Sequence, residues 1–153
     1  MMRNKEHEEM NKRNVHVFPV AMTLMVIAGF SQAAELNLHS RGGIGGELRD
    51  GAIIATGRIV CREAHTRFHV WMNAREDKGR SGHYLVRGKR DSRNELRIKL
   101  EGKDWVPVPA GQRGVERTGT DTQAMFDVVA DGRQHAGPDE YIFSVTGTCD
   151  NSS

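Results

Sequence analysis

The sequence predicts an all-β fold, an incomplete immunoglobulin-like β-sandwich in a single domain. Short segments in which apolar and polar residues alternate follow one another along the chain, and turn signals such as Asp-Gly separate them. No segment shows a convincing helical period bounded by capping residues. The 17 glycines and the aromatic content of 6% also suit a turn-rich β protein better than a helical bundle.

The clearest alternation marks the strands that we expect at either end of the domain and in its middle. Segment 35–40 alternates Leu36 and Leu38 with polar residues, and segment 95–100 alternates apolar with charged residues. In segment 52–62 the alternation places Ile53 and Cys61 on one apolar face. The other expected strands are 67–73, 83–88, 124–130 and 141–149, and the proline-containing segment 105–109 belongs at an edge or in a loop.

An apolar run, residues 15–30, precedes these strands. Lys12 and Arg13 lie before the run, and small residues ending at Ala33 follow it. This pattern is typical of a secretory signal peptide that is cleaved after Ala33. A buried N-terminal helix is the alternative interpretation of the run.

The signal peptide sets the domain boundaries that we expect. Residues 1–33 form the signal peptide, and residues 34–153 form one immunoglobulin-like domain. A translation start at Met10 gives a more typical signal peptide than a start at Met1, because acidic residues follow Met1. The sequence leaves the choice of start open.

The chain contains two cysteines, Cys61 and Cys149. Two cysteines in an exported chain are expected to pair, and each lies on the apolar face of its own expected strand. A disulfide between them would join two sheets across a shared core, as in an immunoglobulin-like sandwich. Metal binding is the rival interpretation, and the wide spacing without a C-x-x-C pattern supports it poorly.

The expected last strand has no successor. An immunoglobulin-type sandwich normally has another strand beside the one that carries its second cysteine, but only residues 150–153 follow here. We therefore expect an open sheet edge and an apolar groove that another chain fills with its own strand, as in pilin donor-strand complementation. The residues expected to line this acceptor groove are Leu36, Leu38, Tyr141, Phe143 and Val145. Alternatively, segment 35–40 is itself a donor arm and the fold begins near Ala52.

Basic residues gather around the hairpin expected between segments 83–88 and 95–100. Such a patch could bind sulfated glycans or carboxylates on a host receptor. A solubilising face that deters edge pairing is the alternative. The residues of this basic patch are Arg87, Lys89, Arg90, Arg93, Arg97 and Lys99.

Other functional classes find little support in the sequence. His65 and His69 are expected on one face of a strand, but no further ligands complete a metal site. No Ser-His-Asp arrangement or carboxylate pair can be assembled, so we expect no enzyme activity and no cofactor. The formal net charge of +2 does not point to nucleic acid.

Several runs of the chain resemble the AfaD/DraD invasin family, among them "AELNLHSRGG", "ATGRIVCREAHT", "FHVWMN" and "YIFSVTGTC". Members of this family are minor tip subunits of Afa/Dr adhesins and of aggregative adherence fimbriae. The resemblance implies a Cys61–Cys149 disulfide and export through the periplasm. It also implies three assembly partners: a periplasmic chaperone, an outer-membrane usher and an adjacent major fimbrial subunit that donates a strand.

The same resemblance implies a function at the fimbrial tip. The family promotes adherence to, and invasion of, host epithelial cells, with integrins proposed as the receptors, and it acts at the cell surface or in secreted form. A structural tip cap that initiates assembly without binding a receptor is the alternative. The sequence identifies neither the receptor nor its contact residues, and it does not show whether the subunit is released free of the fimbria.

Overall fold

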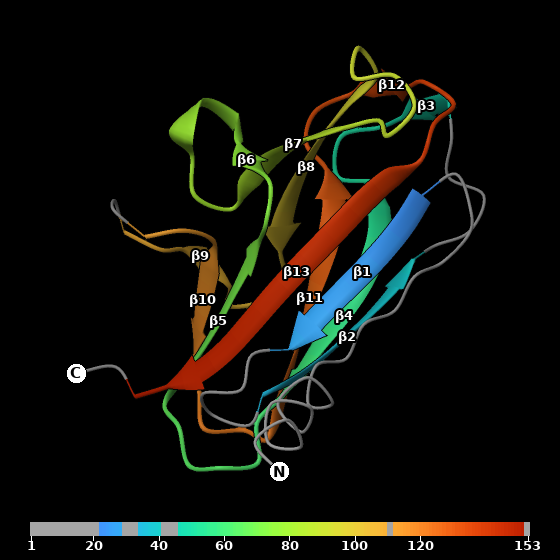
Figure 1. Ribbon diagram of the computed structural model, residues 1–153. Coiled ribbons are helices and arrows are strands. Elements are labelled where there is room, and N and C mark those ends of the chain that lie inside the picture. The colour runs from blue at the N-terminus through green and yellow to red at the C-terminus, as the bar shows by residue number, and fades with distance from the viewer. Residues whose placement is uncertain (1–21, 29–33, 41–45, 110–111, 152–153) are drawn as a thin grey trace, which may run out of the picture.

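The structure is a computed structural model that describes residues 22–28, 34–40, 46–109 and 112–151. Two large sheets pack face to face, and a small two-stranded sheet lies at one end of the sandwich (Figure 1). Within the described residues the only helical element is a single 3-10 turn, η1 (Asp77–Gly79). Among the same residues, no helix is long and apolar enough to cross a membrane. The all-β sandwich is therefore confirmed.

The first sheet has five strands. Their order is β1 (Met22–Ala28), β13 (Tyr141–Asp150), β5 (Arg67–Met72), β10 (Val115–Thr118) and β9 (Val106–Pro107). Strand β1 runs parallel to β13, and the other neighbours in this sheet are antiparallel. The two-residue strand β9 forms the far edge, as its prolines predicted.

The second sheet has six strands, all antiparallel to their neighbours. Their order is β2 (Glu35–Ser40), β4 (Ile53–Val60), β11 (Gln123–Ala130), β8 (Glu95–Glu101), β7 (His83–Arg87) and β6 (Arg75–Glu76). The small third sheet pairs β12 (Gln134–Ala136) with β3 (Gly46–Leu48).

The core lies between the two large sheets. In β8, Leu96, Ile98 and Leu100 are buried and the charged residues between them face outward, as the alternation predicted. Gly57 of β4 leaves room for the ring of Phe126, because a β-carbon at position 57 would overlap that ring. The core is thus closely packed around large side chains from both sheets.

One predicted orientation is wrong. Ile53 was expected to face the core, but its side chain is 38% exposed and Ile54 is fully buried. The cause is a register shift opposite Val128 and Val129, where Ile54 is an extra residue in β4. A β-bulge of this kind moves neighbouring side chains to the opposite face.

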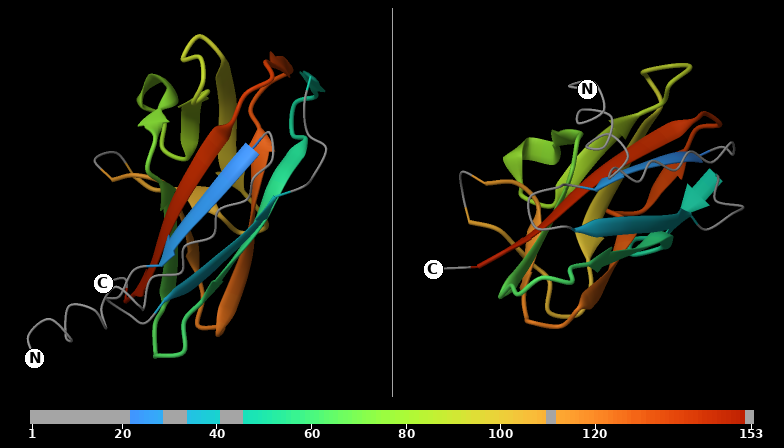
Figure 2. Two further views of the ribbon diagram at one scale, coloured as in Figure 1. Left: turned by 45° about the vertical axis from the view of Figure 1, so that its right-hand side comes forward. Right: turned by 60° about the horizontal axis from the view of Figure 1, so that its bottom comes forward.

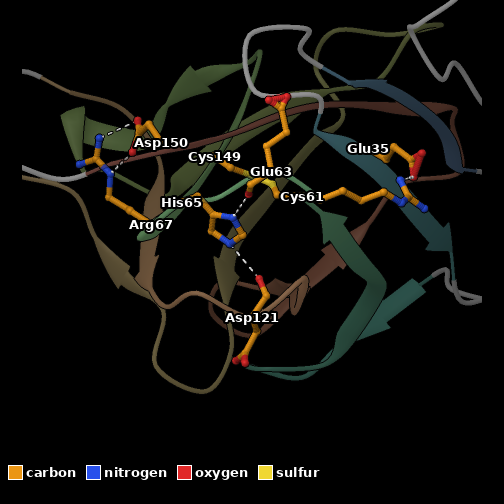
Figure 3. Close-up of a disulfide and its surroundings, with 9 residues drawn as sticks. Glu35, Cys61, Glu63, His65, Arg67, Asp121, Cys149 and Asp150 are labelled. Atoms are coloured by element: carbon orange, nitrogen blue, oxygen red, sulfur yellow. Dashed lines mark hydrogen bonds and ion pairs between the residues drawn. A yellow bond between two sulfur atoms is a disulfide. The ribbon is translucent and has the colours of Figure 1, made fainter.

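The predicted disulfide is present. Cys61 directly follows β4 of the second sheet and Cys149 belongs to β13 of the first sheet, so the bond joins the two sheets (Figure 3). Both cysteines are buried. Nearby, Arg67 donates two hydrogen bonds to the carboxylate of Asp150, at 2.7 and 2.8 Å, and this pairing lowers the pKa of Asp150. The cross-link and the ion pair together fasten the end of β13.

The two histidines do not share a strand face as the sequence suggested. His65 lies in the loop before β5, where it is buried and its ring nitrogens contact the carbonyl oxygens of Glu63 and Asp121 at 2.7 and 2.8 Å (Figure 3). His69 lies on β5 and contacts the carbonyl oxygen of Arg113 at 2.6 Å. Across the described parts of the chain, no group of three or more His, Cys, Asp or Glu side chains is placed to hold a metal ion.

Candidate strand-acceptor groove

The candidate site lies along one border of the sandwich, where the two sheets meet. On this border β13 is the last strand of the first sheet apart from β1, and β2 is the edge of the second sheet. Strand β1 lies between β13 and β2 in all views (Figures 1 and 2). In the described chain after residue 33, no strand pairs with the outer side of β13. Of the residues that the structure describes, only segment 22–28 pairs with that side.

The structure brings the five predicted groove residues together. Leu36 and Leu38 lie on β2, and Tyr141, Phe143 and Val145 lie on β13. All five are buried and belong to one hydrophobic cluster between the sheets. The hydroxyl of Tyr141 donates a hydrogen bond to the carbonyl oxygen of Gly137 at 2.7 Å, which satisfies its polar atom at one end of the groove. Their role in accepting a strand stays a prediction.

The outer side of β13 is paired in parallel with β1, which falls inside the predicted signal peptide. The sequence pattern did not predict a strand there. The pairing aligns Met22, Leu24, Val26 and Ala28 with Tyr141, Phe143, Val145 and Gly147, the buried positions of β13. An apolar segment with strand-like main chain therefore satisfies this border of the sheet.

The two sheets pack closely at Gly147. A β-carbon at this position would lie 2.7 Å from Cδ1 of Ile59 and 3.2 Å from Cδ1 of Leu36, so these two side chains already fill the space. This close contact at Gly147 was not predicted from the sequence. A glycine inside an otherwise alternating strand was the available signal, because such a glycine often marks a close approach of neighbouring groups.

The structure separates the predicted basic patch into two groups. Arg87, Arg97 and Lys99 lie on the outer face of β7 and β8, whereas Lys89, Arg90 and Arg93 lie in the turn between these strands. Carboxylates neutralise three of the six cations. Arg87 lies 3.6 Å from Glu95, Arg93 lies 2.8 Å from Asp91, and Lys99 lies 3.5 Å from Glu101.

The other three cations of the predicted patch are Lys89, Arg90 and Arg97, and none of these three ion pairs includes them. The surface therefore has mixed charge and is not a continuous basic patch. This arrangement suits a solubilising face. Its role in binding an anionic partner stays a prediction.

A buried carboxylate fixes the turn that carries the second group. Asp139 is 3% exposed and accepts hydrogen bonds from the backbone N–H groups of Arg90, Asp91 and Glu140 at 2.7–2.9 Å. It also accepts one from Nδ2 of Asn94 at 3.0 Å. Burial by itself raises the pKa of Asp139, but the four hydrogen bonds outweigh it and lower the pKa to about 2. The turn is thus tied to the strand that begins at Tyr141.

We predict that Asp139→Asn destabilises the chain at neutral pH and that this effect shrinks in acid. Because the folded pKa is lowered from 3.8 to about 2, the stabilisation is fully present above pH 4 and is lost as the pH falls towards 2. Urea unfolding of both proteins between pH 2 and pH 7 measures the difference. Asp121→Asn, at an exposed carboxylate, is the control and should show no such trend. A constant difference between the two proteins would contradict the prediction.

The chain is similar to known proteins in sequence and in structure. The family model for the Enterobacteria AfaD invasin protein matches residues 44–147. Protein AfaD of Escherichia coli is 58% identical over 129 residues, which cover 84% of this chain and 87% of that protein. Both matches extend over most of the chain.

Solved structures agree with this match. The minor tip subunit HdaB of the E. coli Hda pilus is 36% identical, with a TM-score of 0.74 and coverage of 78% of this chain and 84% of that one. A structure from work on fibronectin binding and biofilm formation by the AAF fimbriae of enteroaggregative E. coli is 49% identical. Its TM-score is 0.72, and the match covers 78% of this chain and 87% of that one. The similarity extends from sequence to the immunoglobulin-like fold.

Proposed function

Because this chain belongs to the AfaD invasin family of enterobacteria, we propose that it is a minor subunit at the tip of a chaperone-usher fimbria and promotes adherence to and invasion of host epithelial cells. The family is one of fimbrial subunits and not of enzymes. The observation that carries the proposal is the border between β13 and β2, which no strand of residues 34–151 closes within the described chain. Such a border suits completion by another subunit.

The proposed assembly follows from the chemistry of this border. Cleavage after Ala33 releases the mature domain, and a periplasmic chaperone then covers the groove with one of its own strands. At the outer-membrane usher, the N-terminal arm of an adjacent major subunit replaces the chaperone strand. Main-chain hydrogen bonds to β13 supply affinity, and apolar side chains over Phe143 and Val145 set the register. The finished subunit is displayed at the fimbrial tip.

The melting temperature of residues 34–153 tests the completion step. We expect this domain alone to be unstable, and we expect stabilisation when a donor peptide from the major subunit is fused after Ser153. The matched control carries the same peptide with prolines in its centre, because proline cannot complete a strand ladder. A solitary domain that melts as high as the fusion would overturn the proposal.

Receptor binding separates an adhesin from a structural tip cap. Inert beads coated with the complemented subunit should adhere to cultured epithelial cells if the subunit is an adhesin, and they should enter the cells if it is an invasin. Fibronectin, which one similar structure concerns, and integrins are the receptors to test first. Coated beads that do not bind to the cells would favour the alternative, a tip cap that initiates assembly without binding a receptor.

The basic patch gives a specific prediction for this assay. Changing Lys89, Arg90 and Arg97 to Glu should weaken binding to cells by about tenfold or more if the patch contacts an anionic receptor. Each charge-assisted hydrogen bond contributes about 1.5–3 kcal/mol, and 1.4 kcal/mol is a factor of ten. The charge-matched control changes the exposed residues Arg49, Lys103 and Arg133 to Glu. Unchanged binding by the folded patch variant would leave the patch as a solubilising face.

A further inference from the structure

We infer that a hollow on the outer face of the second sheet binds a sugar residue that carries a carboxylate, such as a uronic acid or a sialic acid. The hollow has a volume of about 510 Å³ and lies over β2, β4 and β11. Ligand sites commonly have volumes of about 300–1,000 Å³, so this hollow is large enough for a small ligand. The inference rests on the proposed function for the source of the ligand, a glycan on the host cell surface.

The alternation of the three strands places the lining side chains on one face. Along this stretch, each strand buries every second residue in the core and leaves the residues between them on the outer face. The register aligns Arg58 of β4 with Asn37 on one side and with Met125 on the other. Thr56 is aligned with His39 in the same way. The side chains that line the hollow are Asn37, His39, Thr56, Arg58, Gln123 and Met125.

Arg58 supplies the positive charge of the hollow. Its side chain is exposed, and no ion pair between described residues includes it. Asp127 is aligned with Thr56 on the same face, but it does not line the hollow and already has an interaction of its own. A guanidinium group binds a carboxylate through two parallel N–H···O bonds. The hollow therefore complements an anionic group.

The uncharged lining groups suit the hydroxyl groups of a sugar. The amides of Asn37 and Gln123 and the hydroxyl of Thr56 can each donate and accept hydrogen bonds. The side chains of Asn37 and Gln123 make no hydrogen bond to another described residue. Met125 is 53% exposed and offers apolar surface to the carbon-bound hydrogens of a sugar ring. An acidic peptide presents its polar groups along an extended main chain, which suits an open sheet edge better than a hollow.

NMR titration of the donor-complemented subunit tests this inference. The probes are the methyl glycosides of glucuronic acid and of N-acetylneuraminic acid, methyl glucoside as the neutral sugar, acetate, and an acetylated Asp-Glu peptide. We expect at least one acidic sugar to shift the backbone N–H signals of β2, β4 and β11. We also expect that sugar to bind about tenfold or more tightly than methyl glucoside or acetate, because only it uses both the guanidinium group and the hydroxyl-binding groups.

Two variants separate the contributions of the lining residues. Arg58→Gln should weaken binding of the acidic sugar by about tenfold or more, since the loss of charge-assisted hydrogen bonds has effects of this size. Asn37→Ala with Gln123→Ala should weaken binding of the sugar and leave the response to acetate unchanged. Arg87→Gln is the matched control and should leave binding unchanged, because Arg87 is exposed on β7 of the same sheet and outside the hollow.

Three results would overturn the inference. The first is that neither acidic sugar shifts the signals of these three strands. The second is an equal effect of Arg58→Gln and Arg87→Gln, and the third is binding of acetate or the acidic peptide as tight as that of the sugar. None of these results bears on strand donation or on cell adhesion, which the melting and bead experiments measure. A failure of this inference is therefore distinguishable from a failure of the proposed function.

Discussion

Replacing both Cys61 and Cys149 by alanine is expected to lower the free energy of unfolding by about 2–5 kcal/mol. The bond closes a loop with a sequence separation of 88, so its loss greatly increases the conformational freedom of the unfolded chain. Both cysteines are buried between the sheets and have almost no contact with solvent. Urea unfolding of the donor-complemented protein under non-reducing conditions measures the change.

The reduced wild-type protein provides the control for this experiment. In excess dithiothreitol, the wild-type protein should unfold at the same urea concentration as the double variant, because both lack the cross-link. A difference of less than about 0.5 kcal/mol between the oxidised wild type and the double variant would contradict the prediction. The packing of β13 against β5 would then hold the border without the disulfide.

Replacing Phe143 by alanine is expected to cost about 3–5 kcal/mol and to weaken the binding of a donor strand. Phe143 is fully buried in the cluster between the sheets, so its removal leaves a cavity. In the proposed assembly this cavity would lie under the incoming donor strand. Ile142→Ala is the matched control, since Ile142 is the preceding residue of β13 and its side chain is 36% exposed on the opposite face.

The two variants are compared by urea unfolding of the complemented protein and by titration with a labelled donor peptide. Ile142→Ala should cost less than about 1 kcal/mol and leave peptide binding unchanged. Equal losses in the two variants would show that the buried face of β13 contributes no more than its exposed face. The acceptor groove would then have to lie elsewhere.

Much of the fold could be predicted because most strands are half-buried. Alternation over Leu96, Ile98 and Leu100 follows from one face that meets the core and one that meets water. Strand β10 escaped prediction, because Val115 is its only apolar residue and its pairing with β5 and β9 holds it in place. The bulge at Ile54 also escaped, since it depends on the register with β11 and not on the local pattern of β4.

The burial of the five predicted groove residues was predictable to a similar degree. The alternation along 35–40 and 141–149 indicated which side chains face inward, and the structure places all five in the core. Their role in accepting a strand stays a prediction. Two features required distant residues. Ile59 and Leu36 fill the space beside Gly147, and the turn of residues 88–94 meets Asp139 about 45 residues later in the chain. Neither contact produces a periodic pattern of residues in the sequence.

Gly147 limits which residues β13 can carry at this position. A β-carbon there would lie 2.7 Å from Cδ1 of Ile59 and 3.2 Å from Cδ1 of Leu36, both in the facing sheet. Even an alanine would therefore force these two side chains to shift. The spacing between the two sheets at this end of β13 thus depends on the absence of a single methyl group.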